Sequence, residues 1–249
     1  MSPRKSSPRR DPFLRRCGRE LWQVEGEREA VGEPAAQPLH ARGMNEIFVR
    51  PFPWWKRALD LAGALAAVAA LAPVMLITGI AIRLSSPGPA IFRQQRAGLG
   101  GVPFTVYKFR TMTADAEAKK AELLKFNERE GPAFKMKSDP RITRVGRFLR
   151  KTSLDELPQF FNVIKGDMSL VGPRPLPVSE TEACALWHRA RLEVKPGITG
   201  LWQVTSRDES SFDRWVRLDL AYAREMSFWQ DFRLLLMTVP AVLSRRGAH

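Results

Sequence analysis

The chain has 249 residues, a size that predicts one ordinary domain with short appendages rather than a multidomain assembly. Its 40 Lys and Arg residues exceed its 26 Asp and Glu residues, so the net charge is +14 and a polyanionic partner is favoured: nucleic acid, an anionic membrane or a phosphorylated substrate. A hydrophobic share of 44% excludes a wholly disordered chain. Only two cysteines, Cys17 and Cys184, are present, which excludes a disulfide framework and a cysteine-based zinc site.

Residues 1–50 are predicted to form a disordered basic tail, because prolines interrupt them repeatedly and no apolar period is sustained. The arginine pair at residues 9–10 is not followed by the apolar stretch that an export signal requires. Met44 precedes an aromatic, basic stretch and could serve as an alternative start. We therefore expect residues 1–43 to be dispensable.

A membrane segment is predicted at residues 61–82, a run of 22 residues without a charge. As a helix that rises about 1.5 Å per residue, it would be roughly 33 Å long, enough to cross the hydrocarbon core of a bilayer. Pro73 interrupts the run, since its ring removes a backbone donor and clashes with the preceding turn. Two interpretations stay open: a kinked single span, or a re-entrant hairpin with arms at 61–72 and 73–82. Basic residues flank both ends, so the positive-inside rule marks neither end as outside, which supports a return to the same side of the membrane.

The region after this segment combines strands and helices. Residues 90–95 and 104–109 are predicted to form a β-hairpin, and the glycines between them predict a turn rather than a phosphate-binding loop. Apolar spacing and stop signals predict several helices. They are expected at residues 113–127, 144–150, 156–165, 180–194 and 213–226. A last helix, at 228–243, is predicted to lie on a membrane surface.

Asp155 and Glu156 stand side by side where a helix is predicted to start. The cations that precede them are Arg141, Arg144, Arg147, Arg150 and Lys151. One interpretation is structural, because Ser153 and Glu156 have the spacing of a capping box, and Asp155 is equally suited to an N-cap position before Pro158. The other is chemical: a helix N-terminus surrounded by cations collects phosphate, and two carboxylates there can hold Mg²⁺ or attack phosphorus. The cations would also keep an aspartate ionised and therefore nucleophilic.

Further stretches carry candidate residues for an anionic substrate. The prolines on both sides of Arg174 fix the backbone, so its guanidinium can contact a phosphate with little entropy left to lose. Lys108 and Arg110 alternate with aromatic residues, which on a strand places both on one face. Trp202 follows a Pro-Gly turn and could stack on a base, although a core position is more frequent for tryptophan.

Four motifs, in this order, resemble those of the bacterial sugar transferase family, the monotopic polyprenyl-phosphate phosphoglycosyltransferases. They are YKFRTM at 107–112, LDELPQ at 154–159, GDMSLVGPRP at 166–175 and KPGITGLWQV at 195–204. The resemblance runs from about residue 53 to about residue 243 and excludes the tail. It implies transfer of a sugar 1-phosphate from a UDP-sugar to undecaprenyl phosphate with release of UMP. Such a reaction begins the synthesis of exopolysaccharide, capsule, O-antigen or another glycoconjugate.

The resemblance also implies residue roles. Asp155 would be the nucleophile that forms an aspartyl phosphosugar, and Asp155 and Glu156 would together hold Mg²⁺. Pro73 would break a re-entrant membrane helix, which favours the hairpin interpretation and a location at the cytoplasmic face of the bacterial inner membrane. With the candidates above, the expected substrate-binding residues are Lys108, Arg110, Arg147, Arg174, Trp202, Gln203 and Arg207.

The expected fold class is therefore mixed α and β, mostly helical with a small β-sheet, with one re-entrant membrane helix plus amphipathic surface helices. The re-entrant hairpin is placed at residues 51–85 and a cytosolic catalytic domain at 86–249. Expected partners are a UDP-sugar, undecaprenyl phosphate, the membrane and Mg²⁺, with no nucleic acid, and the chain could form a homo-oligomer. The alternatives are a non-enzymatic single-span membrane adaptor and a membrane-tethered nucleic-acid-binding protein, although no nucleic-acid-binding motif is present.

Overall fold

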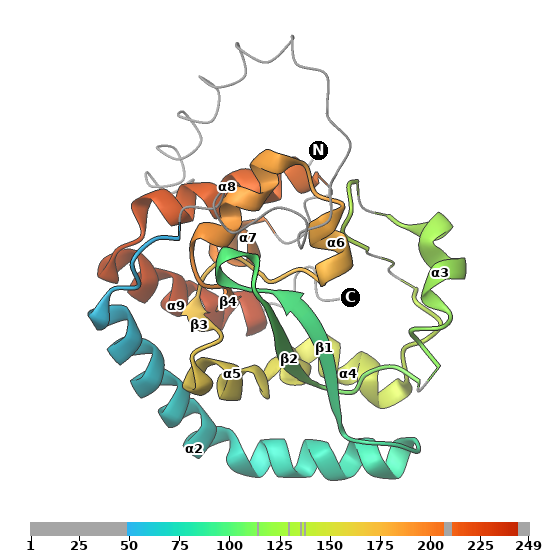
Figure 1. Cartoon of the computed structure of the whole chain (residues 1–249). Helices are drawn as coiled ribbons and strands as arrows, with labels where there is room; N and C mark the ends of the chain where they lie inside the picture. The colour runs from blue at the N-terminus through green and yellow to red at the C-terminus, as the bar shows by residue number, and fades with distance from the viewer. Residues whose placement is uncertain are drawn as a thin grey trace, which may run out of the picture. The chain divides into compact units, whose positions relative to one another are not determined.

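A computed structural model describes residues 49–113, 115–128, 130–134, 136, 138–206 and 211–243. Nearly all of the predicted tail, residues 1–48, lies outside the described residues, and so does Arg207. Figure 1 shows the described elements along the chain.

The long apolar run forms one continuous helix, α2 (Trp54–Ser85), with Pro73 inside it. Figure 1 shows this helix changing direction part-way along its length. A proline inside a helix removes one backbone hydrogen bond and crowds the preceding turn, which is the usual cause of such a bend. The two predicted arms are thus joined in one bent helix, and its path relative to a bilayer stays a prediction.

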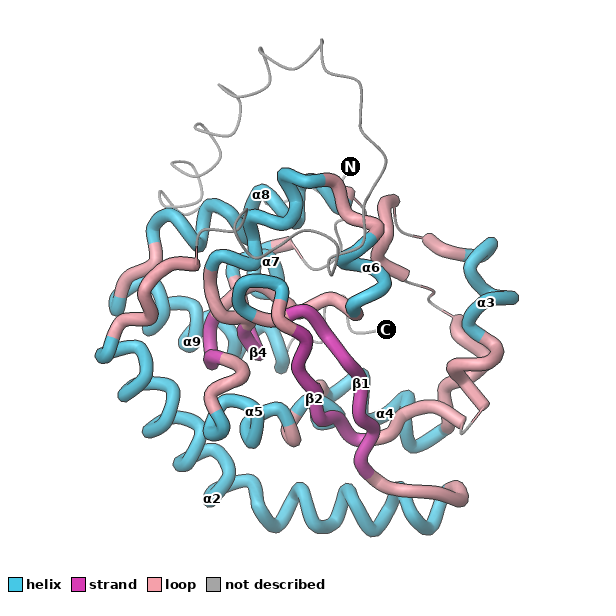
Figure 2. The backbone as a smooth tube through the Cα atoms, in the orientation of Figure 1, coloured by secondary structure: helices cyan, strands magenta, loops and turns pink. Residues whose placement is uncertain are grey.

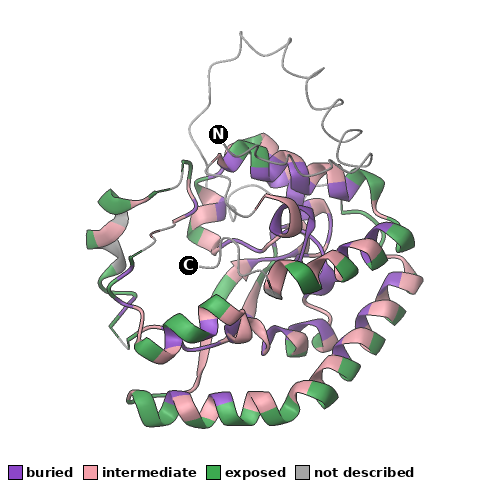
Figure 3. Ribbon diagram, turned by 180° about the vertical axis from the view of Figure 1, so that it is seen from behind, coloured by how far each residue is buried: buried purple, intermediate pink, exposed green. Residues whose placement is uncertain are grey.

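Helix α2 exposes most of its surface. Among the described residues it is the one helix long and apolar enough to cross a membrane, and 11% of its most apolar window is buried. Figure 3 shows mainly exposed and intermediate residues along it. A core helix of a soluble domain would be buried on at least one broad face. The exposure of α2 therefore agrees with the prediction of a membrane segment.

Polar side chains fasten the N-terminal part of α2 to the rest of the fold. The Nζ of Lys56 donates a hydrogen bond to the Tyr222 hydroxyl at 3.0 Å and forms an ion pair with Asp231. One turn further, the Oδ1 of Asp60 accepts a hydrogen bond from the Ser169 hydroxyl at 2.9 Å. Because Lys56 is 1% exposed and Asp231 is 0% exposed, loss of either charge would leave the other buried without its partner.

The predicted hairpin is confirmed. Strands β1 (Ile91–Ala97) and β2 (Pro103–Phe109) pair antiparallel, with Ile91 opposite Phe109. The 3₁₀ turn η3 (Leu99–Gly101) joins them, and Gly100 adopts a φ of 64°, a conformation that suits a residue without a Cβ. The glycine loop therefore acts as a turn, as predicted.

A second, smaller sheet was not predicted. Strands β3 (Ser169–Val171) and β4 (Gly197–Thr199) pair in parallel. Their backbones approach so closely that a Cβ added to Gly197 would lie 2.1 Å from the backbone nitrogen of Gly172. Only glycine fits here, and the contact joins the segment before Arg174 to the segment before Trp202.

The remaining elements are helical. They are α3 (Lys120–Leu123), η4 (Leu124–Phe126), α4 (Arg144–Thr152), η5 (Leu154–Glu156), α5 (Gln159–Lys165), α6 (Val178–Glu182), η6 (Leu186–Glu193), α7 (Leu201–Thr205), α8 (Phe212–Glu225) and α9 (Phe228–Leu243). Helices α4, α8 and α9 confirm the predictions closely. Helices α4 and α5 pack along α2, as Figures 1 and 2 show.

The helix predicted at 156–165 begins at Gln159, after the separate turn η5, and two further predicted helices are wrong in extent. The segment 113–127 contains only the short α3 and η4, and Figure 2 draws most of the chain between β2 and α4 as loop. A short helix without a packed apolar face is only marginally stable, whatever its propensity. The segment 180–194 divides into α6 and η6, where the Arg189 guanidinium donates to the Glu182 carbonyl at 3.1 Å. Arg191 of η6 also donates to the distant Asp219, and such contacts override the helical pattern.

Candidate active site

A cleft of about 540 Å³ lies between the hairpin, the η5 turn, the segment from residue 111 to residue 141 and the loop at 172–177, which we call the Arg174 loop. Its volume is in the usual range for small-molecule sites. Most of the residues that the sequence analysis selected line this cleft. They are Lys108, Arg110, Asp155, Glu156, Arg174, Trp202 and Gln203.

The chain turns sharply just before the carboxylate pair. Ser153 ends α4 in the left-handed conformation, with a φ of 57°, and is the one described non-glycine residue with a positive φ. Its side chain makes no capping hydrogen bond, and Pro158, not an acidic residue, precedes the first residue of α5. The capping-box interpretation is therefore wrong. A strained serine next to two carboxylates is typical of a functional site.

Glu156 is fully engaged by cations. The Nζ of Lys108 donates to its Oε1 at 3.1 Å, and Arg174 donates to both of its oxygens, at 3.2 Å for Oε2. Burial alone would raise the pKa of Glu156, but Arg174 and then Lys108 hold it well below the usual value. Glu156 is thus an ionised carboxylate that pairs with both cations.

Asp155 lies in a contrasting environment. Its side chain is buried, and no other described residue donates a hydrogen bond to its carboxylate. Burial, and then the adjacent Glu156, raises the pKa of Asp155 to about 6, while Lys108, Arg150 and Arg174 oppose this rise. Neighbouring carboxyl groups whose environments push their pKa values apart are typical of catalytic pairs.

Two arginines, Arg191 and Arg96, hold the backbone of the Arg174 loop in place by hydrogen bonds. The backbone oxygen of Arg174 accepts a hydrogen bond from the Nη2 of Arg191 at 2.6 Å, and Arg191 also forms a 2.5 Å ion pair with Asp219. On the other side, Arg96 donates to the carbonyl of Pro175 at 2.5 Å. The sequence analysis missed these supporting residues because a long helix at 180–194 gave no reason to bury Arg191.

Two of the arginines predicted to bind substrate, Arg110 and Arg147, differ from that expectation in their contacts or position. Arg110 lines the cleft, but its Nη2 donates to the Ser86 carbonyl at 2.7 Å and so holds the end of α2. Arg147 is exposed on α4 and does not line the cleft, so its substrate role stays a prediction. Arg150, almost one turn later, lines the cleft instead and donates to the Thr111 hydroxyl at 3.0 Å. The run of basic residues in the sequence did not indicate which face of α4 turns toward the cleft.

Two stacked indoles form another part of the wall. The rings of Trp202 and Trp215 lie with centroids 4.2 Å apart and planes at 18°. Gln203 follows Trp202, and its Nε2 donates to the carbonyl of Ile198 at 3.0 Å. The prediction that Trp202 and Gln203 bind substrate is untested, but both line the same cleft as the carboxylate pair.

Another part of the wall comes from the segment before α4. Arg141 and Asp139 form a buried two-point ion pair, with distances of 2.9 and 2.6 Å. The Arg141 guanidinium also lies 5.4 Å from the ring centroid of Phe134. These contacts order a wall that has little regular secondary structure.

The carboxylates of the cleft are the candidate ligands for Mg²⁺. In the part of the chain that the structure describes, no three His, Cys, Asp or Glu side chains gather in a metal-binding group. Mg²⁺, however, is commonly held by one or two carboxylates together with substrate phosphates. Asp155 offers such a carboxylate, whereas both oxygens of Glu156 already accept hydrogen bonds. The site therefore fits an ion shared with a phosphorylated substrate, and Mg²⁺ stays a proposal.

Comparison with known proteins identifies the family. Residues 52–245 match the model described as bacterial sugar transferase. The chain belongs to this family. The match starts just before α2 and ends after α9, so the resemblance seen in the four motifs is confirmed.

Named relatives of this sugar transferase are similar over most of its length. The galactosyl transferase CpsE of Streptococcus agalactiae is 48% identical over 194 residues, 78% of this chain and 43% of that protein. The undecaprenyl-phosphate galactose phosphotransferase of Salmonella typhimurium is 42% identical, covering 84% of this chain and 44% of that protein. The UDP-glucose:undecaprenyl-phosphate glucose-1-phosphate transferase of Caulobacter vibrioides is 42% identical, covering 78% and 72%. The chain thus spans less than half of the first two relatives.

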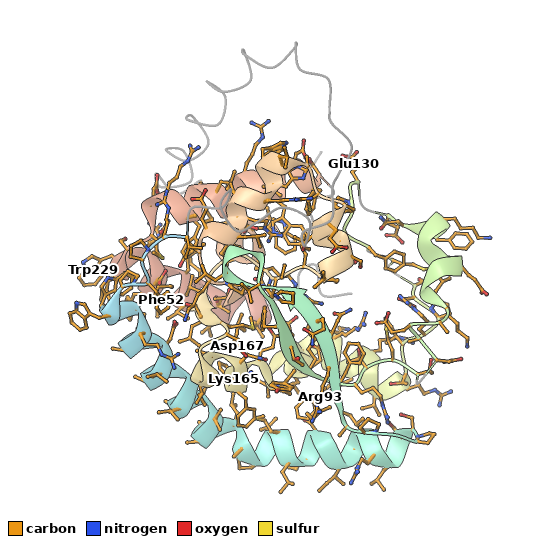
Figure 4. The ribbon with its side chains drawn as sticks, viewed as in Figure 1. Phe52, Arg93, Glu130, Lys165, Asp167 and Trp229 are labelled. Carbon is orange, nitrogen blue, oxygen red and sulfur yellow. The ribbon has the colours of Figure 1, made fainter. Side chains whose placement is uncertain are left out.

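Exposed aromatic residues gather where α9 meets the start of α2. Trp229 is 74% exposed, and Figure 4 shows it pointing away from the fold beside the N-terminal end of α2. Phe228 packs edge-to-face on Trp55 at 6.0 Å, and Trp54 is also exposed. Aromatic residues at the end of an apolar helix are typical of the membrane interface. They support the prediction that α9 is an amphipathic surface helix.

Proposed function

We propose that this sugar transferase moves a sugar 1-phosphate from a UDP-sugar to undecaprenyl phosphate and releases UMP. The observation that carries the proposal is the asymmetry of the carboxylate pair: Glu156 is engaged by Arg174 and Lys108, whereas no described residue donates a hydrogen bond to the Asp155 carboxylate in the cleft. Two relatives that are named for transfer to undecaprenyl phosphate, with galactose or glucose as the sugar, support the substrate class.

In the first step, the ionised carboxylate of Asp155 attacks the phosphorus that bears the sugar. A bond forms between that phosphorus and the carboxylate oxygen, the bond to the UMP oxygen breaks, and UMP leaves with its electron pair. Arg174, Lys108 and Arg150 offer positive charge to the phosphate oxygens, where negative charge develops. Glu156 holds the first two cations in place.

In the second step, a phosphate oxygen of the lipid acceptor attacks the phosphosugar on Asp155. The new bond gives a lipid-linked diphosphate sugar, and the bond to Asp155 breaks to restore its carboxylate. When bound, Mg²⁺ would neutralise part of the diphosphate charge, held by Asp155 and by phosphate oxygens of the substrate. Glu156 stays the second predicted ligand, although its oxygens are engaged.

We further propose that α2 is re-entrant and that the site faces the cytoplasm. Lys56, near the start of α2, is paired with Asp231 of α9. At the other end, Ile82 packs with Phe109 and Leu149 of the same fold. Because a polar domain does not divide across a bilayer, contacts at both ends favour an α2 that enters and leaves on one side. A UDP-sugar donor supports the cytoplasm as that side, because such nucleotide sugars are cytoplasmic metabolites.

The direct test is UMP release by the full chain in detergent or vesicles. UDP-galactose, UDP-glucose and UDP-N-acetylgalactosamine, the sugars in relatives' names, would be supplied with undecaprenyl phosphate. We expect lipid-dependent, continuous UMP release with at least one of them. If none of these or other UDP-sugars yields UMP from folded, membrane-inserted protein, a non-enzymatic membrane adaptor becomes the better interpretation.

The pH dependence of kcat/KM is expected to be bell-shaped. The rate should fall about tenfold per pH unit below about 6, because protonated Asp155 cannot attack phosphorus. It should fall again above about 8, because burial lowers the pKa of Lys108 to about 8, against the opposing effect of Glu156, and deprotonation removes its positive charge. Lys108→Arg is the matched control and should move only the alkaline limb to higher pH. A profile that is flat across both limbs would contradict these roles.

A further inference from the structure

Gln203 has a buried side-chain amide oxygen that accepts no hydrogen bond from the described residues. The side chain is 5% exposed and lines the cleft that contains Asp155. Its Nε2 donates to the Ile198 carbonyl at 3.0 Å, which fixes the orientation of the amide. The Oε1 has no hydrogen-bond donor among the residues that the structure describes.

An orphaned acceptor in a cleft indicates a missing donor. Buried amide oxygens are almost always hydrogen-bonded, since leaving one unpaired destabilises the fold. The oxygen is enclosed and lies near Gly200, where an added Cβ would come within 3.8 Å of it. Trp202, stacked on Trp215, supplies a flat apolar wall of the same cleft. A flat wall and a fixed acceptor in one cleft suit a ring that carries an N–H or O–H group.

We infer that the Oε1 of Gln203 accepts a hydrogen bond from an N–H or O–H of the sugar nucleotide and so determines substrate specificity. The inference rests on the proposed function, because it takes a UDP-sugar as the ligand. Two parts of that ligand carry the required chemistry: the N3–H of uracil and the hydroxyl groups of the sugar. A site built around a hydrogen bond rejects an analogue that lacks the donor far more strongly than an apolar pocket does.

The test is calorimetric binding of UMP, N3-methyl-UMP and UDP-galactose to the full chain in detergent. Gln203→Met removes the acceptor at similar volume, and Gln203→Asn keeps the amide but withdraws it from the cleft. Gln230→Met is the matched control, because Gln230 is also buried with unpaired amide atoms but lies on α9 and does not line the cleft. The Gln230→Met variant should bind all three ligands as the unaltered chain does.

If uracil is the donor, both Gln203 variants should bind UMP about tenfold more weakly or worse, and the unaltered chain should lose affinity similarly for N3-methyl-UMP. If a sugar hydroxyl is the donor, UMP binding should stay unchanged while UDP-galactose binding weakens about tenfold. Either result supports the inference. Unchanged binding of UMP and UDP-galactose by the Gln203 variants would overturn it and leave the proposed function standing. Absence of nucleotide binding by the unaltered chain would overturn both.

Discussion

Asp155→Asn is expected to abolish transfer, with a loss of roughly 10⁴-fold or more, while the chain stays folded. The amide has nearly the shape of the carboxylate but cannot form the phosphosugar bond. Because no described residue donates a hydrogen bond to the Asp155 carboxylate, the substitution breaks no hydrogen bond among the described residues. It also removes a buried charge, so the free energy of unfolding should not decrease.

The decisive measurement uses a UDP-sugar without the lipid acceptor. The unaltered chain should release up to one equivalent of UMP and gain the mass of a phosphosugar on the peptide that contains Asp155. Asp155→Asn should do neither. The matched control is Glu156→Gln, which keeps the nucleophile but removes the charge that fixes Arg174 and Lys108. This variant should fold and react very slowly, with an altered dependence on Mg²⁺.

A different kinetic pattern would overturn the two-step mechanism with a phosphosugar on Asp155. If the unaltered chain forms no adduct, even transiently, and releases UMP only when both substrates are present, the lipid phosphate attacks the donor directly. Asp155 would then be a metal ligand or a general base. The loss of activity in Asp155→Asn alone would not separate these roles, so the adduct measurement is essential.

The parts of the fold that local patterns determine were predictable from sequence. The hairpin follows from alternating residues around a glycine turn, and α8 and α9 follow from their apolar spacing. The site was predictable where residues are adjacent in the chain, as Asp155 and Glu156 are. Motif order also indicated that Arg174 and Lys108 belong with them, although their shared contact with Glu156 is a property of the folded chain.

The parts that depend on contacts between distant segments were not predictable. Strands β3 and β4 are three residues each, too short for a periodic signal, and their pairing depends on the close approach of Gly172 and Gly197. Arg150 rather than Arg147 reaches the cleft because α4 buries Leu149 against the core. Ser153 fits a capping box in sequence but adopts a left-handed conformation. In each case the spacing was compatible with several arrangements, and packing selected one.

Both ends of α2 are expected to react with thiol reagents from the cytoplasmic side. Cysteines would be introduced at Val49, before the helix, and at Ser85, its last residue, both of which are exposed. Cys17 would first be replaced by serine, while Cys184 is buried and can stay. A membrane-impermeant maleimide should label both positions in inside-out vesicles and neither in intact spheroplasts. Labelling from opposite sides would show that α2 crosses the membrane.

Pro73→Leu should disrupt this topology, because leucine restores the missing backbone hydrogen bond and favours a straight helix of about 48 Å, long enough to span. A straight α2 cannot keep both the Lys56–Asp231 pair at one end and the packing of Ile82 on Phe109 at the other. One cysteine should therefore become accessible from the opposite side, and transfer activity should be lost.

Ile77→Leu is the matched control, since it changes an exposed side chain in the same helix without altering its backbone hydrogen bonds, and it should leave labelling and activity unchanged. If Pro73→Leu keeps both cysteines on the cytoplasmic side with full activity, the contacts at the two ends of α2, rather than the proline, hold the helix in its re-entrant path.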